Sequence, residues 1–492
     1  MRGRDDLYKL IKSLSKSEKR YFSLDAQKSG AKSSNYVQLF QAYNEMADFD
    51  ESALRQQFPN LSSDKAYLYE SILQSMRDYR SPKSKAAQIK ERILDAKFLY
   101  ERGLYDQCEE RLQSAKLMAE SLGDSLSRLE INREERRLYK ESEMKRFREN
   151  FQNLKAEKDD LVRSVKDEFH YLDLYDRISL DVASVFQYSK EAEKENLAQE
   201  LSPQSWTVPE GKNAEHRFLQ VNAFFYHLLG ESEKSESYFL KTVEWWDKNP
   251  DIKNDEFFRY IADLSNLLAV YRATGKIAQM RSLLERLENE SPETFHEKNL
   301  MFQRIMIYQF NYYLQQGDFL KLNQLVKEVD SGLKNYLVKD RTKISLLYQV
   351  ASACFLQDDF EQSERWLEKI LDYRGSQVRQ DIQVAAVLLK FICLLESEKS
   401  EDLENFYRSV QRILKSKKSL PFGKVDLWFF DKIKDLFLTG KIEQRGSAGK
   451  FLEQINELKN TEKRLPIFYD LFRFWLYSKK ENKPIQLIYK DL

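Results

Sequence analysis

The histidines and cysteines are the residues of this chain best suited to bind a metal or to act as a nucleophile, and they are few. The 492 residues include four histidines and three cysteines. His216 and His227 are eleven residues apart, which places them on one helix face but about three turns apart, too far for two ligands of one metal ion. Cys108, Cys354 and Cys393 form no C-x-x-C pair. We therefore expect no metal site, no cofactor site and no catalytic thiol.

The segment Gly446–Lys450 shares its glycines and lysine with phosphate-binding loops. It lacks the GxxxxGK[ST] spacing, and Phe451 stands where a hydroxyl side chain should bind magnesium. We predict instead that Ser447 caps a helix that continues from Phe451 to Leu458. The motifs of serine hydrolases, zinc proteases and protein kinases do not occur in the sequence either. These observations predict that the protein is not an enzyme.

The composition predicts an almost entirely helical protein. Only 14 glycines and 9 prolines occur, and both residues break helices. Hydrophobic residues make up 42% of the chain, while charged residues make up 32%, which suits long helices with solvated outer faces. The 80 Lys and Arg residues nearly balance the 79 Asp and Glu residues, and this balance argues against a protein built mainly to coat nucleic acid.

The sequence also bears on where the protein works. Its apolar stretches are too short for a membrane span, and no apolar run follows the first residues as it would in a signal peptide. Three cysteines imply no disulfide framework. We therefore expect a cytoplasmic location and no membrane partner.

A turn recurs along the chain at a nearly constant spacing, each time between two helical stretches. Gly230 lies 45 residues before Gly275, Gly275 lies 42 before Gly317, and Gly317 lies 41 before Asp358. A fixed period of this size is typical of stacked helical arrays. We predict helix–turn–helix units with a period of about 42 residues, with two degenerate units between residues 103 and 230.

The residues around each turn repeat as well. The position four residues before the turn holds Tyr226, Tyr271, Tyr313 or Cys354. Offsets of three and four residues on both sides of the turn place apolar side chains on one helix face. Each helix of a unit therefore has an apolar stripe that it cannot bury alone.

This pattern resembles the tetratricopeptide repeat (TPR) superfamily. The aromatic residue four before the turn, a small residue seven before it and a small residue five after it all match, and Pro292 falls where that family often ends its second helix. TPR units repeat every 34 residues, so the units of this chain are about eight residues longer. The resemblance implies an all-α fold, a right-handed α-solenoid of TPR-like repeats. The segment Ser13–Phe22 is also similar to the start of a group of uncharacterised bacterial helical-repeat proteins, a likeness that implies no activity.

The same patterns suggest a division of the chain. Residues 1–82 contain short helices in tandem, with a capping box at Ser15–Glu18, and are predicted to form a small N-terminal helical module. We expect partly degenerate repeats over 83–200, a loop or hinge at 201–213, and further repeats with a C-terminal cap over 214–492.

The resemblance also implies an interaction surface, because the first helix of each TPR-like unit lines the concave face of the array. Residues there that are not used for packing are candidates for contact with a partner. They are Arg217, Gln220, Phe224, His227, Arg272, Arg304, Asn311, Gln315, Ser345, Tyr348 and Ser352. Such a mixture of arginine, amide and aromatic side chains suits binding of an extended peptide. The alternative interpretation is that these are ordinary, partly exposed helix residues.

Two functions remain open from the sequence. The first is a non-enzymatic scaffold or adaptor that binds another protein or a peptide in its concave groove. The second is a transcriptional regulator in which residues 1–82 bind DNA and the repeats act as a sensor. Lys16, Lys19 and Arg20 give the N-terminal module a small positive edge, but no recognition helix with base-reading residues stands out.

Overall fold

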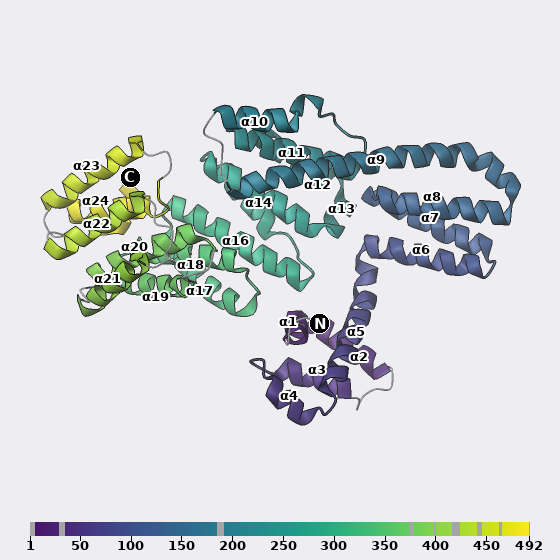
Figure 1. The fold of residues 1–492 in the computed structure, drawn as a ribbon, viewed down its shortest axis with the longest axis horizontal. Helices are drawn as coiled ribbons and strands as arrows, with labels where there is room; N and C mark the ends of the chain where they lie inside the picture. The colour runs from purple at the N-terminus through teal and green to yellow at the C-terminus, as the bar shows by residue number, and fades with distance from the viewer. Residues whose placement is uncertain are drawn as a thin grey trace. The chain divides into compact units, whose positions relative to one another are not determined.

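The fold is helical throughout the part of the chain that the structure describes (Figure 1). This structure is a computed structural model, and it describes residues 5–28, 35–184, 191–373, 378–397, 400–415, 424–439, 445–461 and 465–491. Within these ranges the regular secondary structure consists of α-helices and two short 3-10 helices. The prediction of an all-α protein is therefore confirmed.

The chain divides into two compact units. The first contains Met1–Lys276 and Ser291–Glu297, and the second contains Ile277–Glu290 and Lys298–Leu492. The division falls inside the stretch 214–492 that the sequence suggests as one run of repeats.

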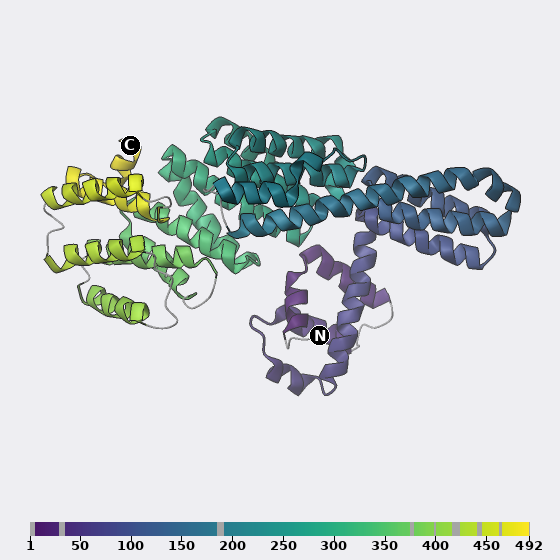
Figure 2. The same ribbon diagram turned by 45° about the horizontal axis from the view of Figure 1, so that its top comes forward.

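Five helices form the N-terminal module of the first unit. They are α1 (Asp6–Ser13), α2 (Lys16–Lys28), α3 (Asn35–Glu45), α4 (Glu51–Gln57) and α5 (Leu61–Arg80). The capping box before α2 is confirmed: the Ser15 N–H donates to Glu18 Oε2 at 2.8 Å, and the Glu18 N–H donates to Ser15 Oγ at 3.2 Å. The module has its own apolar core, with Ile11, Leu39 and Ile72 fully buried. The 3-10 helix η1 (Ser81–Lys83) joins α5 to the next helix, as Figures 1 and 2 show.

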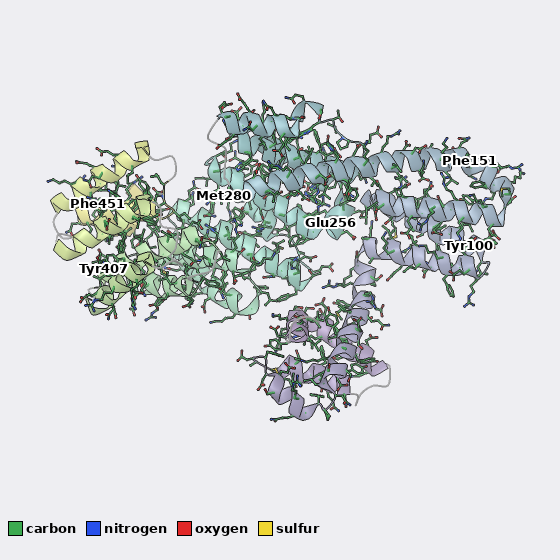
Figure 3. All side chains as sticks on the ribbon, viewed as in Figure 1. Tyr100, Phe151, Glu256, Met280, Tyr407 and Phe451 are labelled. Carbon is green, nitrogen blue, oxygen red and sulfur yellow. The ribbon has the colours of Figure 1, made fainter. Side chains whose placement is uncertain are left out.

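The rest of the first unit is helical as well, with helices of very different lengths. They are α6 (Lys85–Glu101), α7 (Tyr105–Leu122), α8 (Ser125–Ser142), α9 (Met144–Ser184), α10 (Glu191–Leu201), η2 (Pro203–Ser205), α11 (Lys212–Leu229), α12 (Ser232–Lys248), α13 (Pro250–Asp255) and α14 (Phe257–Ala273). Figure 3 labels Tyr100 at the end of α6, Phe151 near the start of α9 and Glu256 just before α14. Residues 202–211, within the stretch 201–213 that the sequence suggests as a loop or hinge, connect α10 to α11 and contain the 3-10 turn η2.

The stretch between residues 103 and 230 departs from the other repeats because α9 is 41 residues long. Its first part packs on α8, where the Asn132 Nδ2–H donates to the Leu154 carbonyl at 3.1 Å. Its second part packs on α11, where the rings of Tyr171 and Phe218 lie 5.4 Å apart. The two degenerate units expected in this stretch stay a prediction: α8 and α9 are separated at Glu143, but α9 then continues unbroken to Ser184.

The second unit begins with α15 (Ile277–Glu288) and contains the greater part of α16 (Phe295–Gln316). Its further helices are α17 (Phe319–Asn335), α18 (Asp340–Phe355), α19 (Phe360–Leu371), α20 (Gln380–Glu396), α21 (Ser400–Lys415), α22 (Lys424–Thr439), α23 (Arg445–Thr461), α24 (Tyr469–Glu481) and α25 (Ile485–Asp491). Ser447 lies inside α23, so the prediction that it caps this helix is wrong: the helix begins two residues earlier.

The recurring turns share one hydrogen-bond pattern. Gly103, Gly230, Gly275 and Gly317 have positive φ between 63° and 79°, and Asp358 has φ 60°. At each turn, the N–H of the following residue donates to the carbonyl of the residue four before the turn, over 2.9 to 3.0 Å. The acceptors for the last four turns are therefore the tyrosines and the cysteine that the sequence places there. This is the Schellman ending, in which a left-handed residue closes a helix, and it explains why glycine recurs at these positions.

A candidate binding groove in the first unit

A buried polar cluster joins α11, α12 and α14. The Asp263 carboxylate of α14 accepts hydrogen bonds from three side chains: His216 Nε2 at 2.8 Å, Trp246 Nε1 at 2.8 Å and Gln220 Nε2 at 2.7 Å. His216 and Asp263 are 0% and 1% exposed. A buried carboxylate is tolerated only when it is paired or well hydrogen-bonded, and three donors satisfy Asp263.

The cluster determines the protonation of its histidine. Burial lowers the pKa of His216 to about 4, so the imidazole is neutral at neutral pH. Its Nε2 faces the Asp263 carboxylate and its Nδ1 faces Arg259 NH2 at 2.8 Å, so Nε2 carries the hydrogen and Nδ1 accepts. Burial alone would raise the pKa of Asp263, but the contact with His216 and the hydrogen bonds from Gln220 and Trp246 hold it below its usual value.

Aromatic rings complete this cluster. The His216 ring lies 4.7 Å from the rings of both Trp245 and Trp246 of α12. The Arg259 guanidinium lies 5.7 Å from the centre of the Trp246 ring. With the Asp263 carboxylate paired and the histidine neutral, the cluster lacks an accessible acid, base or nucleophile. Its geometry holds three helices at a set spacing, which is a structural role.

A groove of about 400 Å³ opens further along the same helices. It lies near the C-terminal ends of α11 and α14 and is also lined by the start of α12 and the end of α9. Its lining residues are Val182, Phe224, His227, Ser232, Ser235, Phe239, Asn266, Ala269, Val270, Arg272, Ala273 and Thr274. The volume lies in the range of about 300–1,000 Å³ that is usual for ligand pockets.

Phenylalanine side chains form one wall of the groove. Phe224 packs edge-to-face on Phe239, with ring centroids 5.1 Å apart, and on Tyr175 of α9 at 6.0 Å. Phe239 is 4% exposed, whereas Phe224 is half-buried and so presents part of its ring to the groove. These contacts hold the Phe224 ring in place before any partner arrives.

The opposite wall is hollow because α14 has small residues where α11 has large ones. Counted back from the turn glycine of each unit, Ala269 occupies the position that Phe224 occupies in α11. Ala273 likewise occupies the position of Leu228. The groove therefore results from a size difference between equivalent positions of two successive units, and a large side chain at Ala269 would fill it.

The polar part of the groove consists of groups that can hydrogen-bond or carry charge. Arg272 is exposed, and in the described ranges it forms no ion pair. The nearby ammonium of Lys276 is bound by both oxygens of Glu236 at 2.6 and 2.8 Å. The half-buried carboxamide of Asn266 lies among the lining residues with Arg272. This combination can bind a group with apolar and anionic parts.

The structure brings three of the sequence-predicted contact residues together at this groove, namely Phe224, His227 and Arg272. Arg217 lies near them on α11, where its guanidinium is 4.8 Å from the centre of the Tyr175 ring and donates to Gln220 Oε1 at 2.7 Å. Gln220 is 4% exposed, so the expectation that its side chain is not used for packing is wrong.

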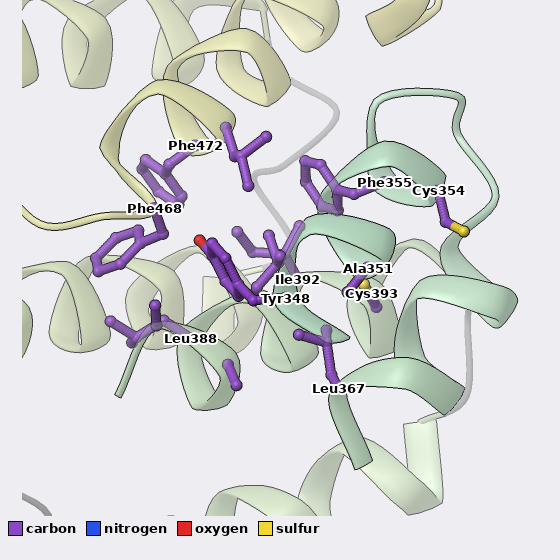
Figure 4. Close-up of a cluster of buried hydrophobic side chains, with 14 of the residues drawn as sticks. Tyr348, Ala351, Cys354, Phe355, Leu367, Leu388, Ile392, Cys393, Phe468 and Phe472 are labelled. Atoms are coloured by element: carbon purple, nitrogen blue, oxygen red, sulfur yellow. The ribbon is translucent and has the colours of Figure 1, made fainter. Parts of the chain in front are cut away.

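The remaining predicted contact residues lie in the second unit. Tyr348 and Ser352 are each 7% exposed, and Figure 4 shows Tyr348 within the buried apolar cluster of that unit. The expectation that these two are free of packing is wrong as well, because α18 is apolar on nearly every side. Gln315 is exposed, and Ser345 Oγ accepts from Arg379 NH1 at 2.8 Å.

On α16, the other two predicted residues are half-buried. Asn311 Oδ1 accepts from Gln349 Nε2 of α18 at 3.3 Å. The Nε of Arg304 is buried and lacks a hydrogen-bond partner in the part of the chain that is described. These two residues therefore lie on the same helix, and Asn311 links it to α18.

Sequence reasoning missed the alanines, Asn266 and Phe239 as parts of the groove. The alanines could have been found, because aligning the sequences of the units on their turn glycines places Ala269 at the position equivalent to Phe224. Phe239 is on the second helix of its unit, and the sequence analysis considered only first helices as contact surfaces.

The cysteines are buried, and burial raises the pKa of Cys108 to about 11 and those of Cys354 and Cys393 to about 12. Over the residues that could be searched, His, Cys, Asp and Glu form no group of three that could hold a metal ion. In the same ranges, no helix combines the length and apolarity that crossing a membrane requires.

Comparisons of the chain with protein-family models, with curated proteins and with solved structures find no match.

Proposed function

We propose that this chain is a non-enzymatic interaction scaffold that binds another protein, or a peptide segment of one, in the groove between α11 and α14. The observation that supports this most directly is the groove itself, which has an immobilised aromatic wall and an exposed arginine that forms no ion pair with the described residues. A pocket of this kind, beside a cluster whose carboxylate is hydrogen-bonded and whose histidine is neutral, suits recognition rather than catalysis.

The proposal includes the architecture that would present this groove. We infer a right-handed α-solenoid of TPR-like units with a period of about 42 residues. The shared hydrogen-bond pattern at five turns supports this inference, as do the links between equivalent helices of successive units. Stacked units bury their apolar stripes against each other and leave one face for binding. We also propose a cytoplasmic location, since the three cysteines are unpaired thiols.

Affinity capture with the full chain tests this function. Three versions are compared by quantitative mass spectrometry: the unmodified protein, Ala269→Phe and Ala192→Phe. Ala269→Phe fills the hollow without removing any polar group, whereas Ala192 is exposed on α10 and lies outside the groove. A specific partner should be lost from Ala269→Phe alone. If every specific partner binds both variants as it binds the unmodified chain, this groove is not the binding site.

The alternative function, DNA binding by residues 1–82, has one supporting observation. Lys16 and Arg20 are exposed and one turn apart on α2, so their charges lie on the same face. Lys19 is half-buried, and burial followed by the charge of Lys12 lowers its pKa. Two exposed cations are a small electrostatic surface for a duplex, and we place this function second.

A further inference from the structure

We infer that the groove recognises an extended segment of a partner protein that carries a large apolar side chain close to an aspartate or glutamate. This inference rests on the proposed function and adds the chemical class of the partner. It depends on two separate features of the groove, its hollow apolar wall and its unpaired positive charge.

The hollow determines the apolar part of the motif. It is bordered by the Phe224 ring on one side and by Ala269 and Val270 of α14 on the other. An aliphatic or aromatic side chain placed there would contact the face of a ring that Tyr175 and Phe239 already hold. Since the ring is fixed beforehand, binding loses little side-chain entropy on this side.

The charge determines the acidic part. His227 and Arg272 each lie three residues before the turn glycine of their units, so they occupy equivalent positions on successive helices. The guanidinium of Arg272 is charged at neutral pH, so Arg272 supplies positive charge to the groove. Because Glu236 neutralises Lys276, the cation of the groove that lacks a described carboxylate partner is Arg272. A carboxylate beside the apolar side chain of the bound segment would form an ion pair with Arg272, whereas a lysine or arginine there would be repelled.

Asn266 supports an extended backbone in the bound segment. Its carboxamide lies nearly two helical turns before Arg272 on α14 and lines the same groove. A carboxamide offers both a donor and an acceptor, the two groups that an extended main chain leaves unpaired.

Selection from a random peptide display library tests the inference, with the purified full chain as bait. The same library is selected in parallel on Ala269→Phe, Arg272→Glu and the control Ala192→Phe. Selected sequences are then synthesised, and their dissociation constants are measured by fluorescence anisotropy. Each parent peptide is compared with three versions: the apolar anchor replaced by serine, the acidic residue replaced by glutamine, and the acidic residue replaced by lysine.

The expected result has a distinct pattern. Loss of the apolar anchor should weaken binding roughly 10- to 100-fold, as burial of one large side chain predicts. Loss of the acidic charge should weaken it about two- to fivefold, the effect of one exposed ion pair. The lysine version should bind Arg272→Glu better than it binds the unmodified chain, which would show that the two charges meet.

Two other results would contradict the inference in different ways. In the first, peptides bind the unmodified chain but not Ala269→Phe, they lack an acidic residue, and Arg272→Glu binds them as well as Ala192→Phe does. The inferred partner chemistry is then wrong, and the proposed function stands. If no selected peptide distinguishes Ala269→Phe from Ala192→Phe, both the inference and the groove as binding site are wrong. Thermal melts of all variants show whether a loss of binding reflects a loss of folding.

Discussion

Replacing Asp263 by asparagine should destabilise the first unit strongly although the change in shape is small. The two oxygens of Asp263 accept from three donors, which belong to His216, Trp246 and Gln220. Asparagine has one oxygen and one NH2 group, so an NH2 group would face a donor on at least one side. Gln220 cannot simply turn its amide to compensate, because its oxygen already accepts from Arg217 at 2.7 Å.

The magnitude follows from the number of groups affected. A hydrogen bond to a charged group contributes about 1.5–3 kcal/mol, and a buried donor left without an acceptor costs about 1–3 kcal/mol. One oxygen can still accept two hydrogen bonds, so part of the energy is retained. We expect Asp263→Asn to lower the free energy of unfolding by about 3–5 kcal/mol, the range seen when one partner of a buried charged pair is removed.

Urea unfolding and amide hydrogen exchange of the full chain measure this effect. Protection should fall in α11, α12 and α14, while the helices of the second unit keep theirs, and the exposed Asp173→Asn serves as control. Because the pKa of Asp263 is lowered in the folded state, its stabilisation is present above pH 3.8 and is lost as the pH falls through the folded-state pKa. Asp263→Asn should lack this acid dependence. A loss below about 1 kcal/mol would refute the claim that Asp263 holds these helices together.

Three further predictions address other parts of the chain. Burial lowers the pKa of His216 from 6.5 to about 4, so the unfolded state binds the proton more readily than the folded state does. The free energy of unfolding should therefore fall by about 3 kcal/mol as the pH falls from 6.5 to 4. In a series of unfolding curves at different pH, His216→Gln should lack this part of the decline. Asp358 accepts a hydrogen bond from the Ile485 N–H at the start of α25 at 2.9 Å. Asp358→Ala should therefore lower the free energy of unfolding by about 2 kcal/mol and increase hydrogen exchange in α25. Asp358→Gly should lower it by about 1 kcal/mol less, because glycine adopts the positive φ of this position freely. If residues 1–82 bind DNA, the unmodified chain should retard a mixed-sequence duplex in a gel at low salt, and the double change Lys16→Glu, Arg20→Glu should abolish the retardation. If the unmodified chain causes no shift at low salt, that function is excluded.

The sequence was sufficient to predict the helices and their turns because these depend on local chemistry. A glycine at positive φ, an aromatic residue four positions earlier and an apolar stripe are all readable within one unit, and Gly230, Gly275 and Gly317 form the predicted turns. The capping box at Ser15 is equally local and is confirmed. The long helix α9 was not predicted, because its continuity depends on packing against both α8 and α11 rather than on any start or stop signal.

Burial across units was much harder to predict. Gln220 of α11 is buried where its amide donates to Asp263 of α14, and Tyr348 of α18 is buried within an apolar cluster drawn from several helices of the second unit. The hydrogen bond between His216 and Asp263 joins residues 47 positions apart, so no local motif in either segment predicts it. Three of the candidate contact residues, Phe224, His227 and Arg272, lie at one groove, and their contact with a partner stays a prediction.

The positions of the cluster and the groove on the same two helices separate stability from recognition. Phe224 lies eight residues beyond His216 on α11, which corresponds to about 12 Å along the helix axis. On α14, Arg272 likewise lies closer to the C-terminal end of the helix than Asp263 does. The cluster can therefore hold the helices at their spacing while residues at the groove change, and substitutions more than about 7–10 Å apart without shared partners act nearly independently. If the groove binds a partner as proposed, Ala269 and Arg272 can change without cost to the fold, provided that Asp263 remains ionised and fully hydrogen-bonded.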